Sequence, residues 1–242
     1  MEDTKLIKGL EKVTSDKKVL VAFPYAGGGA SFYYRWQKPF DGICSVCPVQ
    51  LPGREERFGE KFYTSVEKIA DDVSEILSKT ENPLILYGHS MGTKIVYEVE
   101  KRLEERGKTA ELVIVSGCQN PMDKDRELIA DLPNDDFVEK LISYNGISEE
   151  LVANKDLLKI FLPILRADFI VSEGYKCESL NCLKAPVRAM GGYDDREASE
   201  EAIKGWEQVN PGDFAFEMFE GSHFFIRDNE NVFTTMKNWI AG

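Results

Sequence analysis

A serine between two glycines is the residue of this chain best suited to act as a nucleophile. It lies between an apolar strand pattern and an amphipathic helix pattern, in the segment Gly88-His89-Ser90-Met91-Gly92. A Gly-x-Ser-x-Gly motif in that context predicts a sharp, strained turn that projects the serine hydroxyl. The two glycines leave room where larger side chains would collide with neighbouring backbone. Because the helix that follows directs N–H groups at developing negative charge, the pattern predicts a serine hydrolase.

Only two histidines are present, and a serine hydroxyl needs a base such as histidine to take its proton. His89 lies inside the turn itself, and we expect its ring to face away from the hydroxyl. His223 follows the last predicted strand, in a Gly-Ser-His-Phe segment. We therefore assign His223 as the general base. This chemistry needs no metal, and we expect neither a metal nor another cofactor.

The third member of such a site is a carboxylate that orients the imidazole. In proteins with this strand–turn–helix motif, the acid lies between the serine and the histidine along the chain. Two adjacent aspartates, Asp194 and Asp195, follow a predicted strand in that interval. Their spacing from the glycines before them fits either residue, so the pattern leaves both open.

The rest of the chain alternates short apolar runs with amphipathic helix patterns, which is typical of a mostly parallel sheet with helices on both faces. Together with the serine turn, this alternation predicts an α/β-hydrolase fold in a single domain, residues 1–242. Strands are expected at 19–23, 46–51, 84–87, 112–116, 187–191 and 214–219. Helices are expected at 65–79, 91–106, 197–209 and 231–240.

One stretch, from about residue 119 to residue 183, has no clear strand pattern. It carries helical patterns instead, at 135–144, 148–153 and 155–170. Because insertions at the strand ends of such sheets often cover the active site, we interpret the stretch as a helical lid. A helical excursion that only completes the packing is the alternative.

Composition disfavours several classes of protein. The formal net charge of -12 argues against a nucleic-acid partner. No apolar run approaches the roughly 20 residues that cross a bilayer, and the charged first 18 residues lack the apolar core of a secretory signal. We therefore expect a cytoplasmic monomer without a membrane partner. The five cysteines are expected as free thiols, and the Cys44-x-x-Cys47 pair as structural, because no second pair follows at zinc-site spacing.

Several segments together resemble the type II thioesterases that accompany nonribosomal peptide and polyketide synthases. The resemblance runs from Leu20 to about His223. Besides the serine turn it rests on Ala22-Phe23-Pro24-Tyr25-Ala26-Gly27-Gly28, Gln50-Leu51-Pro52-Gly53-Arg54-Glu55-Glu56-Arg57, Phe161-Leu162-Pro163-Ile164-Leu165-Arg166-Ala167-Asp168, Gly192-Tyr193-Asp194-Asp195 and Gly221-Ser222-His223-Phe224. The second and third of these are more specific than the serine turn, since generic esterases do not usually carry them.

The resemblance implies hydrolysis of acyl groups from the phosphopantetheine arm of acyl carrier and peptidyl carrier proteins, as proofreading of a synthase. It implies that Asp195 is the acid and that the backbone N–H groups of Met91 and Ala26 form the oxyanion hole. General chemistry agrees, because the residue after the nucleophile and the loop after the first strand supply these donors. The chain departs from the family at Thr93 and Lys94, where a small residue usually follows the turn. This departure affects the expected acyl pocket.

Docking of a carrier protein cannot rest on net charge, because carrier proteins are often acidic and this chain is acidic too. Lys94, Lys101 and Arg102 could contribute to docking, but an ordinary solvated helix face is the simpler interpretation. Three competing functions are a general carboxylesterase, a fatty acyl-carrier-protein thioesterase and a catalytically silent binding protein on a hydrolase fold.

Overall fold

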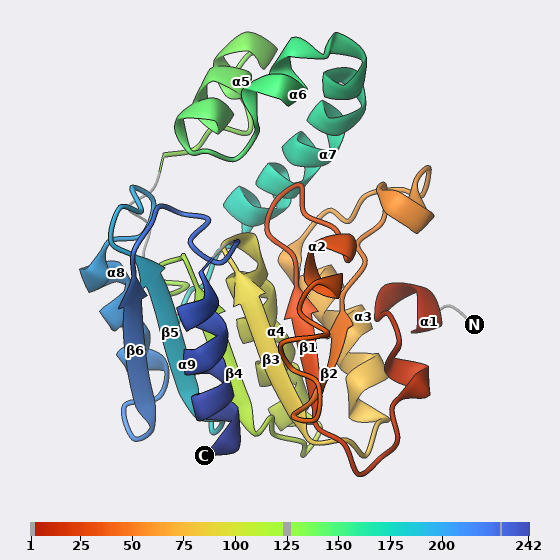
Figure 1. Ribbon diagram of the computed structural model, residues 1–242, viewed down its shortest axis with the longest axis vertical. Coiled ribbons are helices and arrows are strands. Elements are labelled where there is room, and N and C mark those ends of the chain that lie inside the picture. The colour runs from red at the N-terminus through yellow and green to blue at the C-terminus, as the bar shows by residue number, and fades with distance from the viewer. Residues whose placement is uncertain (1–2, 123–126, 228) are drawn as a thin grey trace.

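The centre of the molecule is a single sheet of six parallel strands (Figure 1). The computed structural model describes residues 3–122, 127–227 and 229–242. The strands are β1 (Val19–Phe23), β2 (Ser45–Pro48), β3 (Leu84–His89), β4 (Leu112–Ser116), β5 (Val187–Gly192) and β6 (Phe214–Phe219), in the spatial order β2-β1-β3-β4-β5-β6. The predicted α/β-hydrolase fold class is confirmed.

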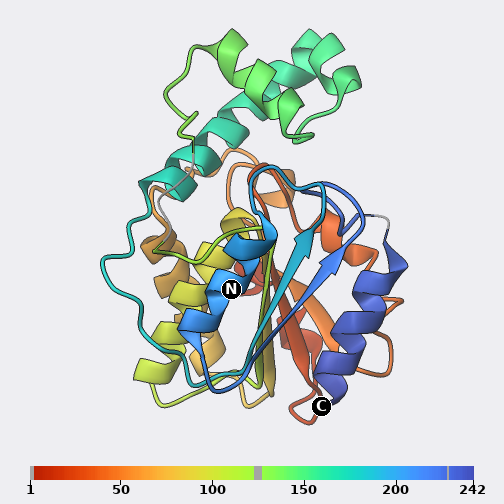
Figure 2. The same cartoon turned by 90° about the vertical axis from the view of Figure 1, so that its left-hand side faces the viewer.

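Both faces of the sheet are covered, which explains why the strands are apolar at nearly every position. In β1, the side chains of Val19, Val21 and Phe23 join one core cluster, and those of Leu20 and Ala22 join the other. Figure 2 shows α3 and α4 on one side of the sheet and α9 on the other. The covering helices are α3 (Val66–Ser78), α4 (Met91–Glu105) and α8 (Glu200–Lys204) with the first cluster, and α2 (Ser31–Tyr34) and α9 (Glu230–Ala241) with the second.

Two predicted elements are shorter in the structure. The strand expected at 46–51 ends at Pro48: the Val49 N–H makes the last hydrogen bond to β1, at the Ala22 carbonyl, and Val49 itself forms an antiparallel bridge with Ile7. The helix expected at 197–209 begins only at Glu200, after Ser199 caps it, and continues as the 3-10 turn η3 (Gly205–Val209). The chain between β5 and this helix is therefore a loop at the carboxyl end of the sheet.

The described residues between β4 and β5 form three helices, which stand beyond the carboxyl ends of the strands (Figure 1). They are α5 (Asn134–Ser143), α6 (Glu149–Ala153) and α7 (Lys155–Gly174). Their apolar side chains form a small cluster of their own around Phe137, Leu141 and Leu165. The last part of α7 instead joins the main core through Val171. This long helix therefore connects the outer helices to the body of the molecule.

The remaining short elements lie near the N-terminus and after β2. They are α1 (Asp3–Leu6) and the 3-10 turns η1 (Leu10–Lys12) and η2 (Glu55–Arg57). Among the helices of the described residues, none combines the length and apolar character that crossing a membrane requires.

Candidate active site

Ser90 lies between β3 and α4 in a backbone conformation that non-glycine residues rarely adopt. Its φ is 53 and its ψ is -118, so the turn holds the serine in a strained geometry. Both flanking glycines are required by close backbone contact. A Cβ on Gly92 would lie 2.6 Å from the carbonyl oxygen of Phe23, and one on Gly88 would lie 2.7 Å from the amide nitrogen of Thr93. Close packing of β1, β3 and α4 therefore produces the turn that presents the hydroxyl.

The imidazole of His223 lies against Asp195. Its Nδ1 is 2.9 Å from Asp195 Oδ2, and because an ionised carboxylate can only accept, Nδ1 is the donor. The Asp195 side chain is fully buried, whereas Asp194 is exposed and points its backbone N–H at the carbonyl of Gly221, at 3.0 Å. The structure thus brings the second aspartate of the pair, and not the first, to the histidine.

A second carboxylate, which the sequence did not reveal, lies on the other side of this imidazole. Glu197 Oε1 is 3.8 Å from His223 Nε2, the nitrogen that would face a nucleophile. The backbone N–H of Glu197 donates to Asp195 Oδ1 at 2.9 Å, which also holds the acid. No local signal identified Glu197, since its segment was expected to be helical and the loop around Asp195 is a tertiary feature.

These neighbours set the protonation of His223. Burial by itself lowers the pKa of this imidazole, but the hydrogen bond to Asp195 and the charges of Glu197 and Asp195 outweigh burial, so the pKa lies above its ordinary value. The pKa of Glu197 is also raised, chiefly by burial. The charge of His223 opposes this rise, and the charge of Asp195 adds to it. A histidine with such neighbours is stabilised in its protonated form, as a general base requires after it accepts a proton.

His89 is the other histidine, and its environment is different. It is fully buried, its Nδ1 lies 2.9 Å from Ser116 Oγ, and its ring centroid is 5.0 Å from that of His223. Burial, followed by the charge of His223, holds the pKa of His89 well below its ordinary value. Because His89 is buried and neutral, its ring is suited to packing beside the ring of His223, which it supports sterically.

A cavity of about 290 Å³ opens over the serine turn. Ser90, Met91 and Ala26 line it from the body of the molecule, and α7 contributes Phe169 and Ser172. An adjoining cavity contains Asp195 and His223 and shares three lining residues with the first, namely Tyr144, Arg196 and Glu197. The five residues expected to take part in catalysis therefore line two neighbouring cavities that share part of their wall.

Thr93 and Lys94, the positions where the chain departs from the resemblance, both have defined contacts. The hydroxyl of Thr93 donates to the carbonyl of Ser90 at 2.7 Å. Lys94 is buried, lines the cavity and donates through Nζ to the carbonyl of Ser172 in α7, at 3.0 Å. Interpretation of Lys94 as part of a solvated helix face was wrong, because the lysine lies beneath α7.

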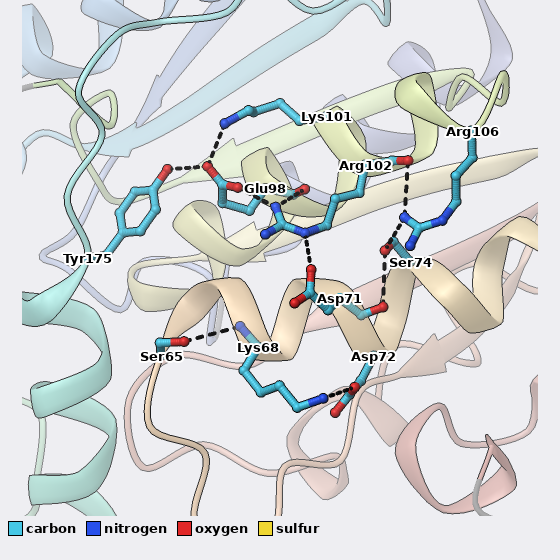
Figure 3. A network of polar contacts seen from close by, with 10 residues as sticks. All are labelled: Ser65, Lys68, Asp71, Asp72, Ser74, Glu98, Lys101, Arg102, Arg106 and Tyr175. Atoms are coloured by element: carbon cyan, nitrogen blue, oxygen red, sulfur yellow. Dashed lines mark hydrogen bonds and ion pairs between the residues drawn. The ribbon is translucent and has the colours of Figure 1, made fainter.

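Lys101 and Arg102 are also more enclosed than expected (Figure 3). The side chain of Glu98, which is 7% exposed, accepts from Lys101 Nζ at 2.8 Å and from the Tyr175 hydroxyl at 2.7 Å. Arg102 pairs with the same carboxylate and donates through Nε to Asp71 of α3 at 2.6 Å. Arg102 therefore ties α4 to α3, Glu98 ties α4 to the chain after α7, and both cations are engaged in ion pairs.

None of the five cysteines forms a disulfide, and burial raises the pKa of both Cys44 and Cys47 to about 12. Within the described ranges no group of three or more histidine, cysteine and acidic side chains is arranged to hold a metal ion.

Comparison with known proteins agrees with this geometry. The family model of the thioesterase domain matches residues 18–240. This chain belongs to the thioesterase family. It is 33% identical over 217 residues to the gramicidin S biosynthesis protein GrsT of Aneurinibacillus migulanus, covering 87% of this chain and 84% of that protein. It is 31% identical to the thioesterase PikA5 of Streptomyces venezuelae, over 86% of this chain and 75% of that one.

Among solved structures, this thioesterase is similar to YbtT, described as a type II thioesterase from the yersiniabactin nonribosomal peptide and polyketide pathway. The TM-score is 0.81 at 31% identity, and the match covers 93% of this chain and 92% of YbtT. The thioesterase is thus an α/β-hydrolase whose relatives work in peptide and polyketide biosynthesis, and it acts on thioester bonds.

Proposed function

We propose that this thioesterase removes acyl groups from the phosphopantetheine arm of carrier proteins in a nonribosomal peptide or polyketide system, with Ser90, His223 and Asp195 as its catalytic residues. The observation that carries the proposal is the buried His223–Asp195 hydrogen bond beside a cavity that Ser90 enters from a strained turn. The named relatives supply the pathway context.

The reaction follows from these contacts. Ser90 Oγ attacks the thioester carbonyl carbon while His223 Nε2 accepts the hydroxyl proton, and Asp195 stabilises the resulting imidazolium. The N–H groups of Met91 and Ala26 stabilise the tetrahedral oxyanion. The intermediate then expels the pantetheine sulfur, which takes the proton from His223. Water, deprotonated by His223, attacks the acyl-enzyme in turn, and the product acid leaves as Ser90 regains its proton.

The cavity favours a small acyl group over a long alkyl chain. Its volume of about 290 Å³ is at the small end of ligand pockets, and its lining includes the charged side chains Lys94, Glu127, Glu173, Arg196 and Glu197. Burying a long apolar chain among charged groups would leave those groups poorly solvated. This supports an editing role over the chain-terminating role of a fatty acyl-carrier-protein thioesterase.

The helices α5 and α6, and α7 as far as Ile170, serve in this proposal as a lid. Tyr144, which follows α5, and Phe169 of α7 line the cavity, so the lid supplies part of its wall. The lid therefore contributes to the shape of the acyl pocket, and the carrier arm must pass its rim to reach Ser90.

The test is hydrolysis of carrier proteins loaded with acetyl, aminoacyl or long-chain acyl-phosphopantetheine, followed by intact-protein mass spectrometry. We expect the short acyl groups to be released by the wild-type enzyme and retained with Ser90→Ala. Faster turnover of a free oxyester than of any loaded carrier would instead favour a carboxylesterase. Preference for the long chain would favour a fatty acyl-carrier-protein thioesterase, and failure of Ser90 to react with a fluorophosphonate would favour a silent binding protein.

A further inference from the structure

A buried ion pair joins α7 to the loop after β2. Arg54 donates through Nη1 to Asp168 Oδ2 at 2.5 Å and through Nη2 to Asp168 Oδ1 at 2.7 Å. The two side chains are only 6% and 7% exposed. Asp168 lies on α7 and Arg54 precedes η2, 114 positions earlier in the chain. The pair thus fixes the lid helix to the body beside the cavity.

The same carboxylate holds the loop that carries Ala26. Its Oδ2 accepts the backbone N–H of Gly27 at 2.7 Å, and the guanidinium donates to the carbonyl of Gly28 at 3.0 Å. The loop is a tight turn, closed by the hydrogen bond from the Gly28 N–H to the Tyr25 carbonyl at 2.9 Å, with Gly27 at φ 78. Positive φ at the third turn position is typical of a type II turn, in which Ala26 is the second residue.

One face of α7, together with Tyr175 just after the helix, makes the contacts with the turn and with α4. A Cβ added to Gly27 would lie 2.5 Å from Leu165 Cδ2, so Leu165 packs directly on the turn. Asp168 follows three positions later, Ser172 accepts from a lysine of α4, and the hydroxyl of Tyr175 reaches a glutamate of α4. Because residues three and four apart share a helix face, this face seats α7 on the turn and on α4 together.

Stability alone does not explain a pair this deeply buried. Removing two charges from water costs free energy that their attraction only partly returns, and an apolar pair of similar volume is often as stable. The pair instead fixes the relative orientation of the two side chains, since the planar guanidinium and the carboxylate fit in one bidentate arrangement. Here that arrangement also accepts the Gly27 N–H and so holds the turn, in which the bond from the Gly28 N–H to the Tyr25 carbonyl orients the peptide that carries the Ala26 N–H.

We propose that Asp168 and Arg54 are positioning residues, which hold the oxyanion-hole donor of Ala26 in place. Through Asp168 the position of this donor depends on the lid helix. With the Gly27 N–H bound to the Asp168 carboxylate, the adjacent Ala26 is held at the wall of the cavity that Ser90 enters. The oxyanion donor is then in place only while α7 is seated, so movement of the lid changes catalysis as well as access. This inference rests on the proposed role of Ala26.

The decisive variant is Asp168→Asn, which keeps the side-chain volume and replaces one carboxylate oxygen with an N–H₂ group that cannot accept from Arg54 or Gly27. Loss of one oxyanion donor costs about 100- to 1,000-fold in kcat. A misdirected donor should cost less, so we expect kcat to fall by roughly tenfold or more while KM stays nearly unchanged. The readouts are hydrolysis of acetyl-loaded carrier protein and the acylation burst with p-nitrophenyl acetate, which needs the same oxyanion hole.

A second readout separates the oxyanion hole from the triad. In a Ser90→Cys background, iodoacetamide alkylates the thiolate that His223 generates, and this displacement forms no oxyanion. We expect the alkylation rate of Ser90→Cys and of Ser90→Cys/Asp168→Asn to agree within about twofold. The matched control is Asp156→Asn, an exposed aspartate in the first turn of the same helix, which should change neither readout. Thermal unfolding of each variant checks that it folds.

If Asp168→Asn does not fold, Arg54→Lys replaces it, because lysine keeps the charge but not the bidentate fork; kcat should again fall with KM unchanged. Unchanged kcat in a folded variant overturns the inference, and so does an equal fall in kcat and in alkylation. If the carrier protein is not hydrolysed but the p-nitrophenyl acetate burst falls in Asp168→Asn, the proposed substrate fails and the positioning role stands. Absence of acylation of wild-type Ser90 by either substrate overturns both.

Discussion

The carboxylate of Glu197 should set the pH range in which this thioesterase works. Its Oε1 lies 3.8 Å from His223 Nε2, and its negative charge contributes to the raised pKa of that imidazole. Glu197→Gln removes this charge and keeps the side-chain volume. His223 must be neutral to accept a proton, so a lower pKa extends activity to lower pH. The acidic limb of the kcat/KM profile should therefore move toward lower pH.

The distance gives the size of this shift. Two unit charges this far apart interact by about 1 kcal/mol in water and by about 4 kcal/mol at an effective dielectric constant of 20. The Glu197 side chain is 31% exposed, so solvent screening favours the lower part of that range. Since about 1.4 kcal/mol corresponds to one pKa unit, the limb should move by about one pH unit.

The assay is kcat/KM for a p-nitrophenyl ester from about pH 5 to about pH 9, at low and high salt. Salt should narrow the difference between wild type and variant, because part of the interaction passes through solvent. Glu201→Gln, on the exposed side of α8, is the matched control and should leave the limb in place. If the acidic limb of the kcat/KM profile is unchanged in Glu197→Gln, or moves to higher pH, the electrostatic argument is refuted.

Three further outcomes follow from the structure. Asp195→Asn should lower kcat by about four orders of magnitude by favouring the wrong tautomer of the base; a fall of less than tenfold in steady-state kinetics would contradict its assignment. Gly92→Ala should destabilise the fold by a few kcal/mol because its Cβ meets backbone, whereas Gly174→Ala, with open space around it, should be nearly neutral in urea unfolding. Buried Glu100 has a pKa raised to about 8, chiefly by burial, so its contribution to stability is complete below about pH 4.5 and is lost as pH rises through 8. Between about pH 4.5 and about pH 8 the free energy of unfolding should fall by at most about 5 kcal/mol, and Glu100→Gln should reduce this pH dependence. An identical slope in the variant would contradict the role given to Glu100.

Much of the architecture could be predicted from local pattern. Apolar runs mark the strands because both faces of a parallel sheet are buried, and the serine turn is visible because Gly88, Ser90 and Gly92 lie within one short segment of the chain. His223 followed from a count, since one of only two histidines lies inside the turn. Errors fell at element ends, where Ser199 and a bridge to Ile7 changed the boundaries.

What the sequence determined by itself was therefore a short set of candidates: one serine proposed as the nucleophile, one histidine proposed as the base and two aspartates for the acid. The choice between Asp194 and Asp195 by contact needed the fold, because adjacent residues differ only in which one turns inward. The carboxylate of Glu197 and the Arg54–Asp168 pair were likewise decided by tertiary structure. Their effects depend on distances of a few ångströms between side chains from separate segments, and no local pattern of residue types records such distances.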